Sequence, residues 1–285
     1  MTEPSTPCHS NSEIGKIGVF DSGYGGLTIL SGIRKVLPQY DYIYLGDNAR
    51  APYGTRSFDV VYDFTLQAVK HLFDRGCRLV ILACNTASAK ALRSIQQNDL
   101  PGIDPSRRVL GVIRPTVEIF GGISCSGHIG VLGTPGTVNS HSYALETEKL
   151  FPEIDITEFA CPMWVPLIEN NEARGEGADW FVKKYIDQIM QLDPRIDAIV
   201  LACTHYPILL PKILRYLPER IKRVISQGDI VGDSLADYLR RHPEMDRTLS
   251  KGGSMEYLTT ENPEKFNSLA SIFTGTEVRA HHTRL

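Results

Sequence analysis

The sequence predicts an α/β fold of two similar domains, each a doubly wound parallel sheet, which face each other across an active-site cleft. Three observations support this prediction. Short apolar runs of strand length alternate with longer amphipathic stretches, as in repeated βαβ units. The length of 285 residues is enough for two domains of ordinary size. In addition, two pairs of sequence landmarks recur in the same order in the two halves of the chain.

The expected strands are short, rich in Val and Ile, and lack polar alternation, which is typical of strands covered on both faces. They span residues 17–20, 42–45, 79–84, 109–113, 129–132, 154–159, 196–203 and 221–225. The stretches between them carry apolar residues at helical spacing. These stretches predict helices over residues 25–37, 57–75, 87–97, 139–150, 178–192 and 209–217. Strands that alternate with helices in this way imply parallel sheets.

The repeated landmarks indicate that the two halves fold alike. The run IGVF at 17–20 is nearly copied as IGVL at 129–132, and a glycine-rich turn follows each copy. LVILACNTAS at 79–88 resembles AIVLACTHYP at 198–207, which puts Cys84 and Cys203 in register. Short apolar strands resemble one another by composition, but two pairs in the same order favour two similarly folded halves.

Composition limits the possible partners. With 30 Lys and Arg against 33 Asp and Glu, the net charge is −3 and there is no basic stripe, so no nucleic-acid ligand is expected. The apolar runs are far shorter than the roughly 20 residues that span a bilayer, so no membrane crossing is expected. Residues 1–13 lack the apolar core of a secretory signal and are expected to form a flexible tail. The six cysteines should then be free thiols in a reducing cytoplasm.

Cys84 and Cys203 are the strongest candidates for chemistry. Each ends an expected strand, and ligands of parallel α/β sheets bind at the carboxyl ends of strands. Each also precedes a polar helix start, where exposed N–H groups and the helix dipole would lower the pKa of a thiol towards 7. If the halves face each other, both thiols enter one cleft. For either cysteine alone, a buried core position is the alternative.

Two facing thiols suit few reactions. A metal site is poorly supported and no metal is expected, because Cys203 and His205 are not accompanied by a C-x-x-C pair. A redox disulfide would require the two sulfurs to touch. A cysteine nucleophile assisted by His205 or Asp21 leaves the second thiol without a role. Racemisation uses both thiols, because a base removes a proton from one face of a stereocentre while an acid delivers another to the opposite face.

Five motifs, in order and with natural spacing, resemble the glutamate racemase family of the cofactor-independent aspartate/glutamate racemase superfamily. They are FDSGYGGLT at 20–28, LGDNARAPYG at 45–54, ACNTAS at 83–88, GVLGTPGTV at 130–138 and ACTHYP at 202–207. The segments PMWVPLIE at 162–169 and EYLTTENPEKF at 256–266 extend the resemblance over nearly everything after residue 16.

The resemblance implies an isomerase that interconverts L- and D-glutamate without a cofactor, with Cys84 and Cys203 as the acid/base thiols. It implies that Cys84 takes the proton from D-glutamate and Cys203 takes it from L-glutamate. His205 and Glu169 are implied to assist the thiols, with Glu172 as the alternative to Glu169, and Asp21 carries the charge for an α-ammonium. The implied substrate contacts are Asp21, Ser22, Tyr53, Gly54, Asn85, Thr86, Thr134, Thr204 and His205.

For several of these residues, a purely structural role is an alternative to the functional one. Thr86 and Thr204 are also suitable helix caps, as are Thr134 and Thr137, and Tyr53 has the character of a packing residue. Asp21 is also a typical turn residue, because an aspartate carboxylate can accept a hydrogen bond from the backbone of its own turn.

The resemblance also implies that the second domain is inserted into the first, with residues 14–112 plus 228–285 in one and 113–227 in the other. The sequence alone equally allows two consecutive domains. A homodimer is expected, as is a role in supplying D-glutamate for bacterial peptidoglycan synthesis. The rival hypotheses are an aspartate or hydantoin racemase, a Cys–His hydrolase, and a two-lobed amino-acid-binding protein.

Overall fold

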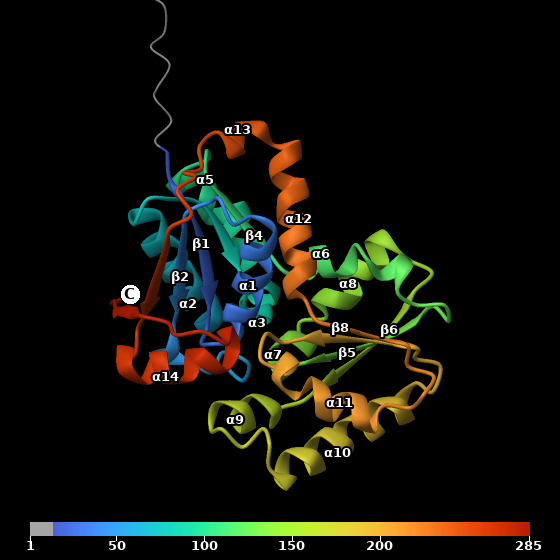
Figure 1. Cartoon of the computed structure of the whole chain (residues 1–285). Coiled ribbons are helices and arrows are strands. Elements are labelled where there is room, and N and C mark those ends of the chain that lie inside the picture. Colours follow the sequence, from blue (N-terminus) through green and yellow to red (C-terminus); the bar gives the residue numbers. More distant parts are fainter. Residues whose placement is uncertain (1–13) are drawn as a thin grey trace, which may run out of the picture.

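The computed structural model describes residues 14–285, so the expected flexible tail at 1–13 lies outside the described residues. Figure 1 shows two separate sheets, each flanked by helices. Every strand pairing within these two sheets is parallel. The predicted α/β class with two parallel-sheet domains is therefore confirmed. Within the described residues, no helix has the length and apolarity that crossing a bilayer requires.

The first sheet has six strands in the order β10-β9-β2-β1-β3-β4. Its strands are β1 (Lys16–Asp21), β2 (Tyr42–Gly46), β3 (Cys77–Leu82), β4 (Arg108–Gly111), β9 (Met255–Thr259) and β10 (Ala280–His282). One face is covered by α1 (Gly26–Val36), α12 (Gly228–Arg241) and α14 (Pro263–Thr274). The other is covered by α2 (Phe58–Asp74) and α3 (Asn85–Lys90). Cover on both faces explains why β1, β2 and β3 read as uninterrupted apolar runs.

The second sheet has four strands in the order β6-β5-β7-β8. These are β5 (His128–Gly133), β6 (Asp155–Ala160), β7 (Ala198–Ala202) and β8 (Arg223–Ile225). The helices α9 (Trp164–Glu169), α10 (Glu176–Leu192) and α11 (Leu210–Tyr216) cover one face. The short α6 (Ile113–Val117) and α8 (Ser142–Leu150) cover the other.

Two of the expected helices differ in the structure. The helix expected over 87–97 is α3, then α4 (Leu92–Ser94), a π-helical turn (Ile95–Asp99) and α5 (Leu100–Ile103). The helix expected over 139–150 begins only at Ser142, as α8, and is separate from the preceding α7 (Pro135–Val138), because His141 has a left-handed backbone with φ of 53°. A single residue in this conformation cannot continue a right-handed helix.

The expected elements stop at residue 225, whereas the structure continues with α12, α13 (Pro243–Asp246), β9, α14 and β10. The two strands were missed because they are only partly buried and so lack the apolar run that marked the others. α12 packs along α1 in backbone contact, and the two helices lie side by side in Figure 1. A Cβ on Gly232 would lie 2.7 Å from the Gly32 carbonyl oxygen, so this contact requires glycine.

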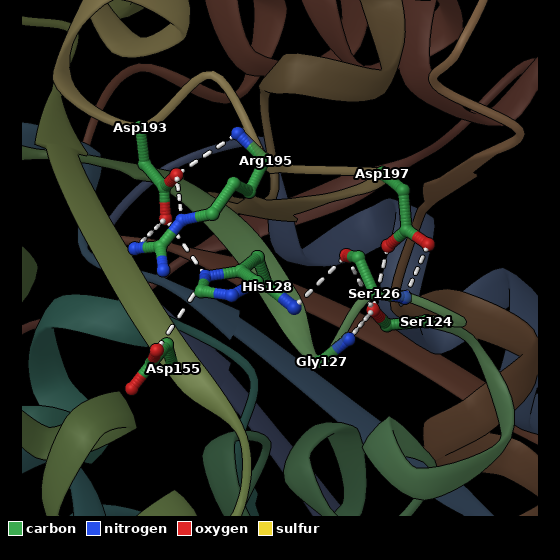
Figure 2. Close-up of polar contacts among 8 residues, drawn as sticks. All are labelled: Ser124, Ser126, Gly127, His128, Asp155, Asp193, Arg195 and Asp197. Atoms are coloured by element: carbon green, nitrogen blue, oxygen red, sulfur yellow. Dashed lines mark hydrogen bonds and ion pairs between the residues drawn. The ribbon is translucent and has the colours of Figure 1, made fainter.

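The amino ends of the second sheet are closed by polar side chains (Figure 2). His128, at the start of β5, is 2.9 Å from Asp193 and 3.5 Å from Asp155. Asp197 accepts hydrogen bonds from the Ser124 hydroxyl and from the Ser126 amide at 2.6 and 2.9 Å. These contacts hold together the loops at this edge, which lies opposite the carboxyl ends of the strands, where ligands of parallel sheets bind.

Candidate active site

The carboxyl ends of β1 and β3 meet those of β5 and β7 around a cavity of about 70 Å³. All of the predicted site residues except Asp21 line it: Ser22, Tyr53, Gly54, Cys84, Asn85, Thr86, Thr134, Glu169, Cys203, Thr204 and His205. A larger cavity of about 610 Å³ between α3, α6, α8 and α12 is lined by none of them. The smaller cavity is therefore the candidate site, and both thiols contribute to its wall.

Cys84 lies between β3 and α3, at the N-cap position of α3. Its sulfur is 3.5 Å from the Ser22 hydroxyl oxygen. Burial, with a smaller contribution from the Asp21 carboxylate, raises the pKa of the Cys84 thiol to about 12, although the Ser22 hydroxyl and the Ala87 amide oppose the rise. The expectation that the helix start brings this pKa towards 7 is therefore wrong for the unliganded protein, because desolvation of the thiolate outweighs the polar contacts.

Cys203 follows β7, and its sulfur is 3.9 Å from His205 Nδ1. The other ring nitrogen, Nε2, is 3.0 Å from Glu169 Oε1. Burial alone would lower the pKa of His205, but its hydrogen bonds with Cys203 and Glu169 outweigh burial and raise the pKa to about 10. Of the two candidate carboxylates, Glu169 rather than Glu172 makes this contact. The imidazole is thus held between a sulfur and a carboxylate in its protonated form at neutral pH.

Asp21, at the end of β1, lies behind the cavity wall and is fully buried. It accepts hydrogen bonds from the Gly23 amide at 2.9 Å and from the Thr204 hydroxyl at 3.4 Å. Burial raises the pKa of this carboxyl, while His205 opposes the rise. The adjoining turn needs glycine at residue 25, since a Cβ there would lie 2.5 Å from His205 Nδ1. The glycine-rich turn thereby brings the two domains into contact at the thiols.

Threonine hydroxyls connect the two domains beside the cavity. Thr86 and Thr134 are 2.9 Å apart through their hydroxyl oxygens, although one follows β3 and the other follows β5. Thr134 also caps α7, accepting a hydrogen bond from the Thr137 amide at 3.3 Å. Tyr53 lines the cavity, but its hydroxyl donates to the buried Asp47 carboxylate. Thr134 therefore caps a helix and borders the cavity at once, and the Tyr53 hydroxyl is already used.

Eight residues of the cavity wall were not among the predicted site residues, and three of them lie near Cys203. Cys161, Val165 and Pro166 line the cavity beside Cys203 and make part of its surface apolar. Their segment, residues 162–169, was noticed only as a motif, and Cys161 carried no polar continuation to mark it. Buried side chains behind the wall, Tyr143 and Gln227, hold Asn85 and had no sequence signal at all. Within residues 14–285, no cluster of His, Cys, Asp and Glu is arranged to hold a metal ion.

Comparison with known proteins identifies the class first. Residues 27–230 match the family model described as Asp/Glu/Hydantoin racemase, and the chain belongs to that family. It is 41% identical to the glutamate racemase of Roseobacter denitrificans, over 90% of this chain and 96% of the relative. It is 40% identical to the glutamate racemase of Ruegeria sp., over 92% and 97%.

Solved structures agree. Glutamate racemase isoform RacE1 from Bacillus anthracis superimposes with a TM-score of 0.85 at 31% identity, covering 95% of this chain and 98% of that one. The resemblance to glutamate racemases is therefore confirmed, and the chain is an amino-acid racemase, an isomerase.

Proposed function

We propose that the chain interconverts L- and D-glutamate by a two-thiol acid/base mechanism. The observation that carries this proposal is that Cys84 and Cys203, from the carboxyl ends of different sheets, line one cavity. The two sulfurs are also close enough to interact, since Cys203 contributes to the raised pKa of Cys84. Support for glutamate as the substrate comes from the glutamate racemase of Francisella tularensis, which was solved with D-glutamate. That structure has 32% identity and a TM-score of 0.83, and covers 95% of this chain and 97% of its own.

The neighbours of the two thiols prepare them for opposite roles. His205, with its pKa raised to about 10, holds a proton beside Cys203, which leaves the Cys203 sulfur free to act as the base. Cys84, with its pKa raised to about 12, carries a proton and is ready to act as the acid. Cys203 then removes the α-proton of L-glutamate, the enantiomer that we assign to this thiol. For D-glutamate the roles reverse, and the positive α-ammonium offsets the charge of Asp21 and favours the Cys84 thiolate.

The polar wall stabilises the charge that develops when the α-proton leaves. Electrons then move onto the substrate carboxylate, and hydrogen-bond donors that already face it lower the barrier. We assign this role to the Asn85 amide and to the Thr86, Thr134 and Thr204 hydroxyls. Because the Tyr53 hydroxyl is engaged with Asp47, we assign substrate contact in that loop to the main chain of Tyr53 and Gly54.

The cavity must widen to accept a ligand. Its volume of about 70 Å³ is far below the roughly 300–1,000 Å³ of typical small-molecule sites. Widening by separation of the two domains would break the Thr86–Thr134 contact and move the sulfurs apart. We therefore assign this structure to a closed arrangement, and substrate entry to an opening between the domains.

We also infer that the chain crosses between the domains near residues 112/113 and 227/228, which makes 113–227 an inserted domain. The strands of the first sheet all lie outside that range and those of the second all lie inside it. A homodimer in the cytoplasm that supplies D-glutamate to peptidoglycan synthesis completes the proposal. Light scattering of the purified chain tests the dimer directly.

The reaction itself is tested with pure L-glutamate in heavy water and no added cofactor. We expect the optical rotation to decay to zero while deuterium replaces the α-proton, because every inversion exchanges that proton. L-Aspartate serves as the comparison substrate. Turnover of L-aspartate without turnover of L-glutamate would assign the chain to another branch of the family, and loss of rotation without deuterium uptake would exclude the two-thiol route.

A further inference from the structure

A closed ring of hydrogen bonds lies behind Asn85, the residue that follows Cys84. Gln227 Nε2 donates to the Tyr143 hydroxyl at 2.9 Å, and that hydroxyl donates to Asn85 Oδ1 at 2.7 Å. Asn85 Nδ2 then donates to Gln227 Oε1 at 2.6 Å, which closes the ring. All three side chains are at least 97% buried. In such a site each polar group needs its partner, because water does not replace a lost one.

The ring connects the parts of the chain that join the two domains. Gln227 stands immediately before α12, where the chain returns to the first sheet, and Tyr143 belongs to α8 of the second domain. The second hydrogen of Gln227 Nε2 goes to the Thr116 hydroxyl at 2.8 Å, in α6, where the chain leaves the first sheet. Thr116 in turn donates to the Val112 carbonyl at 2.7 Å. Gln227 Nε2 also lies 3.3 Å from Asn85 Oδ1 and 3.5 Å from the Val112 carbonyl oxygen, but its two shortest hydrogen bonds are those to Tyr143 and Thr116.

One hydrogen of the Asn85 side-chain amide takes no part in the ring. The Asn85 amide has two N–H groups and one oxygen; the ring uses one N–H and the oxygen, and the described part of the chain offers no partner to the other N–H. A rotation of this amide by 180° would place its oxygen against the Gln227 oxygen and its nitrogen against the Tyr143 hydroxyl. The contact with Gln227 would become a repulsion between two oxygens, and the Tyr143 hydrogen would lose its acceptor, so the ring favours one orientation of an amide that lines the cavity.

We propose that Gln227 and Tyr143 are positioning residues that hold the Asn85 amide with its spare Nδ2 hydrogen towards the cavity, where it donates to a carboxylate of the substrate. This inference rests on the proposed function for the identity of the substrate. In the opposite orientation, the Asn85 oxygen would face the carboxylate and repel it. The ring therefore determines that this wall accepts an anionic group and not a hydrogen-bond donor. It also makes that preference depend on both joints between the domains.

The test uses Tyr143→Phe and Gln227→Met, each of which keeps the size of the side chain but removes the ring. Tyr42→Phe and Gln96→Met are matched controls, because each removes one hydrogen bond to a main-chain carbonyl, of Leu37 or of Val109, away from the cavity. Calorimetry measures the affinity of each protein for D-glutamate, D-glutamine and D-isoglutamine. The two amides each replace one carboxylate by a group that pairs with Asn85 in either orientation.

We expect both ring variants to bind D-glutamate about 10- to 100-fold more weakly, the range for one hydrogen bond to a charged group. One of the two amides lacks the carboxylate that Asn85 contacts. The affinity for this amide should change less than about threefold, whereas general damage to the site would weaken the binding of all three ligands. In an Asn85→Ala background, Tyr143→Phe should cause no further loss, because the two changes remove the same interaction. Gln227→Glu gives a second approach if Gln227→Met fails to fold, since it keeps the shape and draws the Tyr143 hydrogen away from Asn85.

The inference is overturned if both ring variants bind D-glutamate as the controls do, or if all three ligands weaken equally. Failure of the proposed function can be distinguished from failure of this inference. A wild-type protein that does not racemise glutamate, but whose affinity for a carboxylate ligand still depends on the ring, would keep this inference and reject the substrate.

Discussion

In the first domain Cys84 has the Ser22 hydroxyl at 3.5 Å and the Asp21 carboxylate behind it. In the second domain Cys203 has His205 at 3.9 Å, and Glu169 is hydrogen-bonded to the far side of that imidazole. The two sites share their position in the fold, since each cysteine follows a central parallel strand and precedes a helical turn. Their polar neighbours differ: a buried carboxyl group with a raised pKa lies behind one sulfur, and an imidazole with a raised pKa lies beside the other.

This difference shows that a repeated backbone does not make two equal bases. The position of each sulfur follows from strand order and from the ends of β3 and β7. Its ionisation follows from side chains outside the repeat: Ser22 and Asp21 follow β1, and Glu169 ends α9. Under the proposed mechanism, these side chains give the two thiols opposite roles, with one as the acid and the other as the base.

Removing either sulfur is the strongest way to break the comparison. We expect Cys84→Ser and Cys203→Ser each to lower the racemisation rate by about 10²- to 10⁴-fold, because a serine hydroxyl replaces one of the two acid/base groups. Exchange on one face should survive. Cys84→Ser should still exchange the α-proton of L-glutamate in heavy water, and Cys203→Ser that of D-glutamate, in each case without inversion. Proton NMR and chiral chromatography measure the two processes.

Cys125→Ser is the control, since that thiol is exposed and far from the cavity wall. Near-wild-type racemisation in either active-site variant would reject the two-thiol mechanism. Exchange of the same enantiomer by both variants would reject the assignment of faces while leaving the mechanism in place.

The partners of the thiols should matter unequally. We expect His205→Asn to lower the racemisation rate about 10²-fold, because Cys203 then loses the group that holds its proton, and Ser22→Ala to lower it about tenfold or less. The isotope effect with α-deuterated L-glutamate should rise more in His205→Asn than that with α-deuterated D-glutamate. Equal rises for both enantiomers would mean that His205 serves the whole site rather than the Cys203 side.

Much of the fold was predictable because it depends on local chemistry. Buried parallel strands are apolar throughout, so β1, β3, β5 and β7 were recognised, as were the cysteines that follow two of them. β9 and β10 were not, because these two strands are only partly buried and have no such run. In the site too, residues close in sequence to a recognised motif were predictable, and residues brought there by the tertiary fold were not. His205 is two residues from Cys203 and was found, whereas Gln227 and Tyr143 reach Asn85 only through the tertiary fold.

The electrostatic state of the site was not predictable either. A cysteine before a helix favours a lowered pKa, but the pKa of Cys84 is raised by burial, and by the Asp21 carboxylate from another strand. Sequence spacing gives the local contacts of a group and not its distance from solvent. Gly232 of α12 is a similar case. The need for a glycine at this position became evident only from its close contact with Gly32.

Asp21→Asn sharpens the comparison by removing the anion from the Cys84 side. We expect the pKa of Cys84 to fall below its present value of about 12, by about one unit, because a cause of the rise is deleted while burial remains. Ultraviolet absorbance of the thiolate against pH, corrected with the Cys84→Ser protein, measures the shift. Asp104→Asn, on the surface of the first domain, should leave the titration unchanged. An unchanged titration in Asp21→Asn would mean that burial alone sets the pKa of Cys84.

The smallest effect concerns stability against pH. The pKa of His205 is raised from 6.5 to about 10 in the folded chain, so its contribution to stability is complete below about pH 6.5 and is lost as the pH rises through about 10. Between pH 7 and 9, the Tm of the wild type should therefore fall by a few degrees more than that of His205→Asn.

His71 supplies the control of opposite sign. Burial lowers its pKa from 6.5, so its contribution is complete above that value and is lost only as the pH falls below it. Between pH 7 and 9 the Tm of His71→Asn should accordingly run parallel to that of the wild type, while the curve of His205→Asn converges on it. If the His205→Asn curve also runs parallel, the imidazole is not charged in the folded protein. The contrast between a cationic and an anionic thiol site would then be lost, because Cys203 would have no more electrostatic help than Cys84.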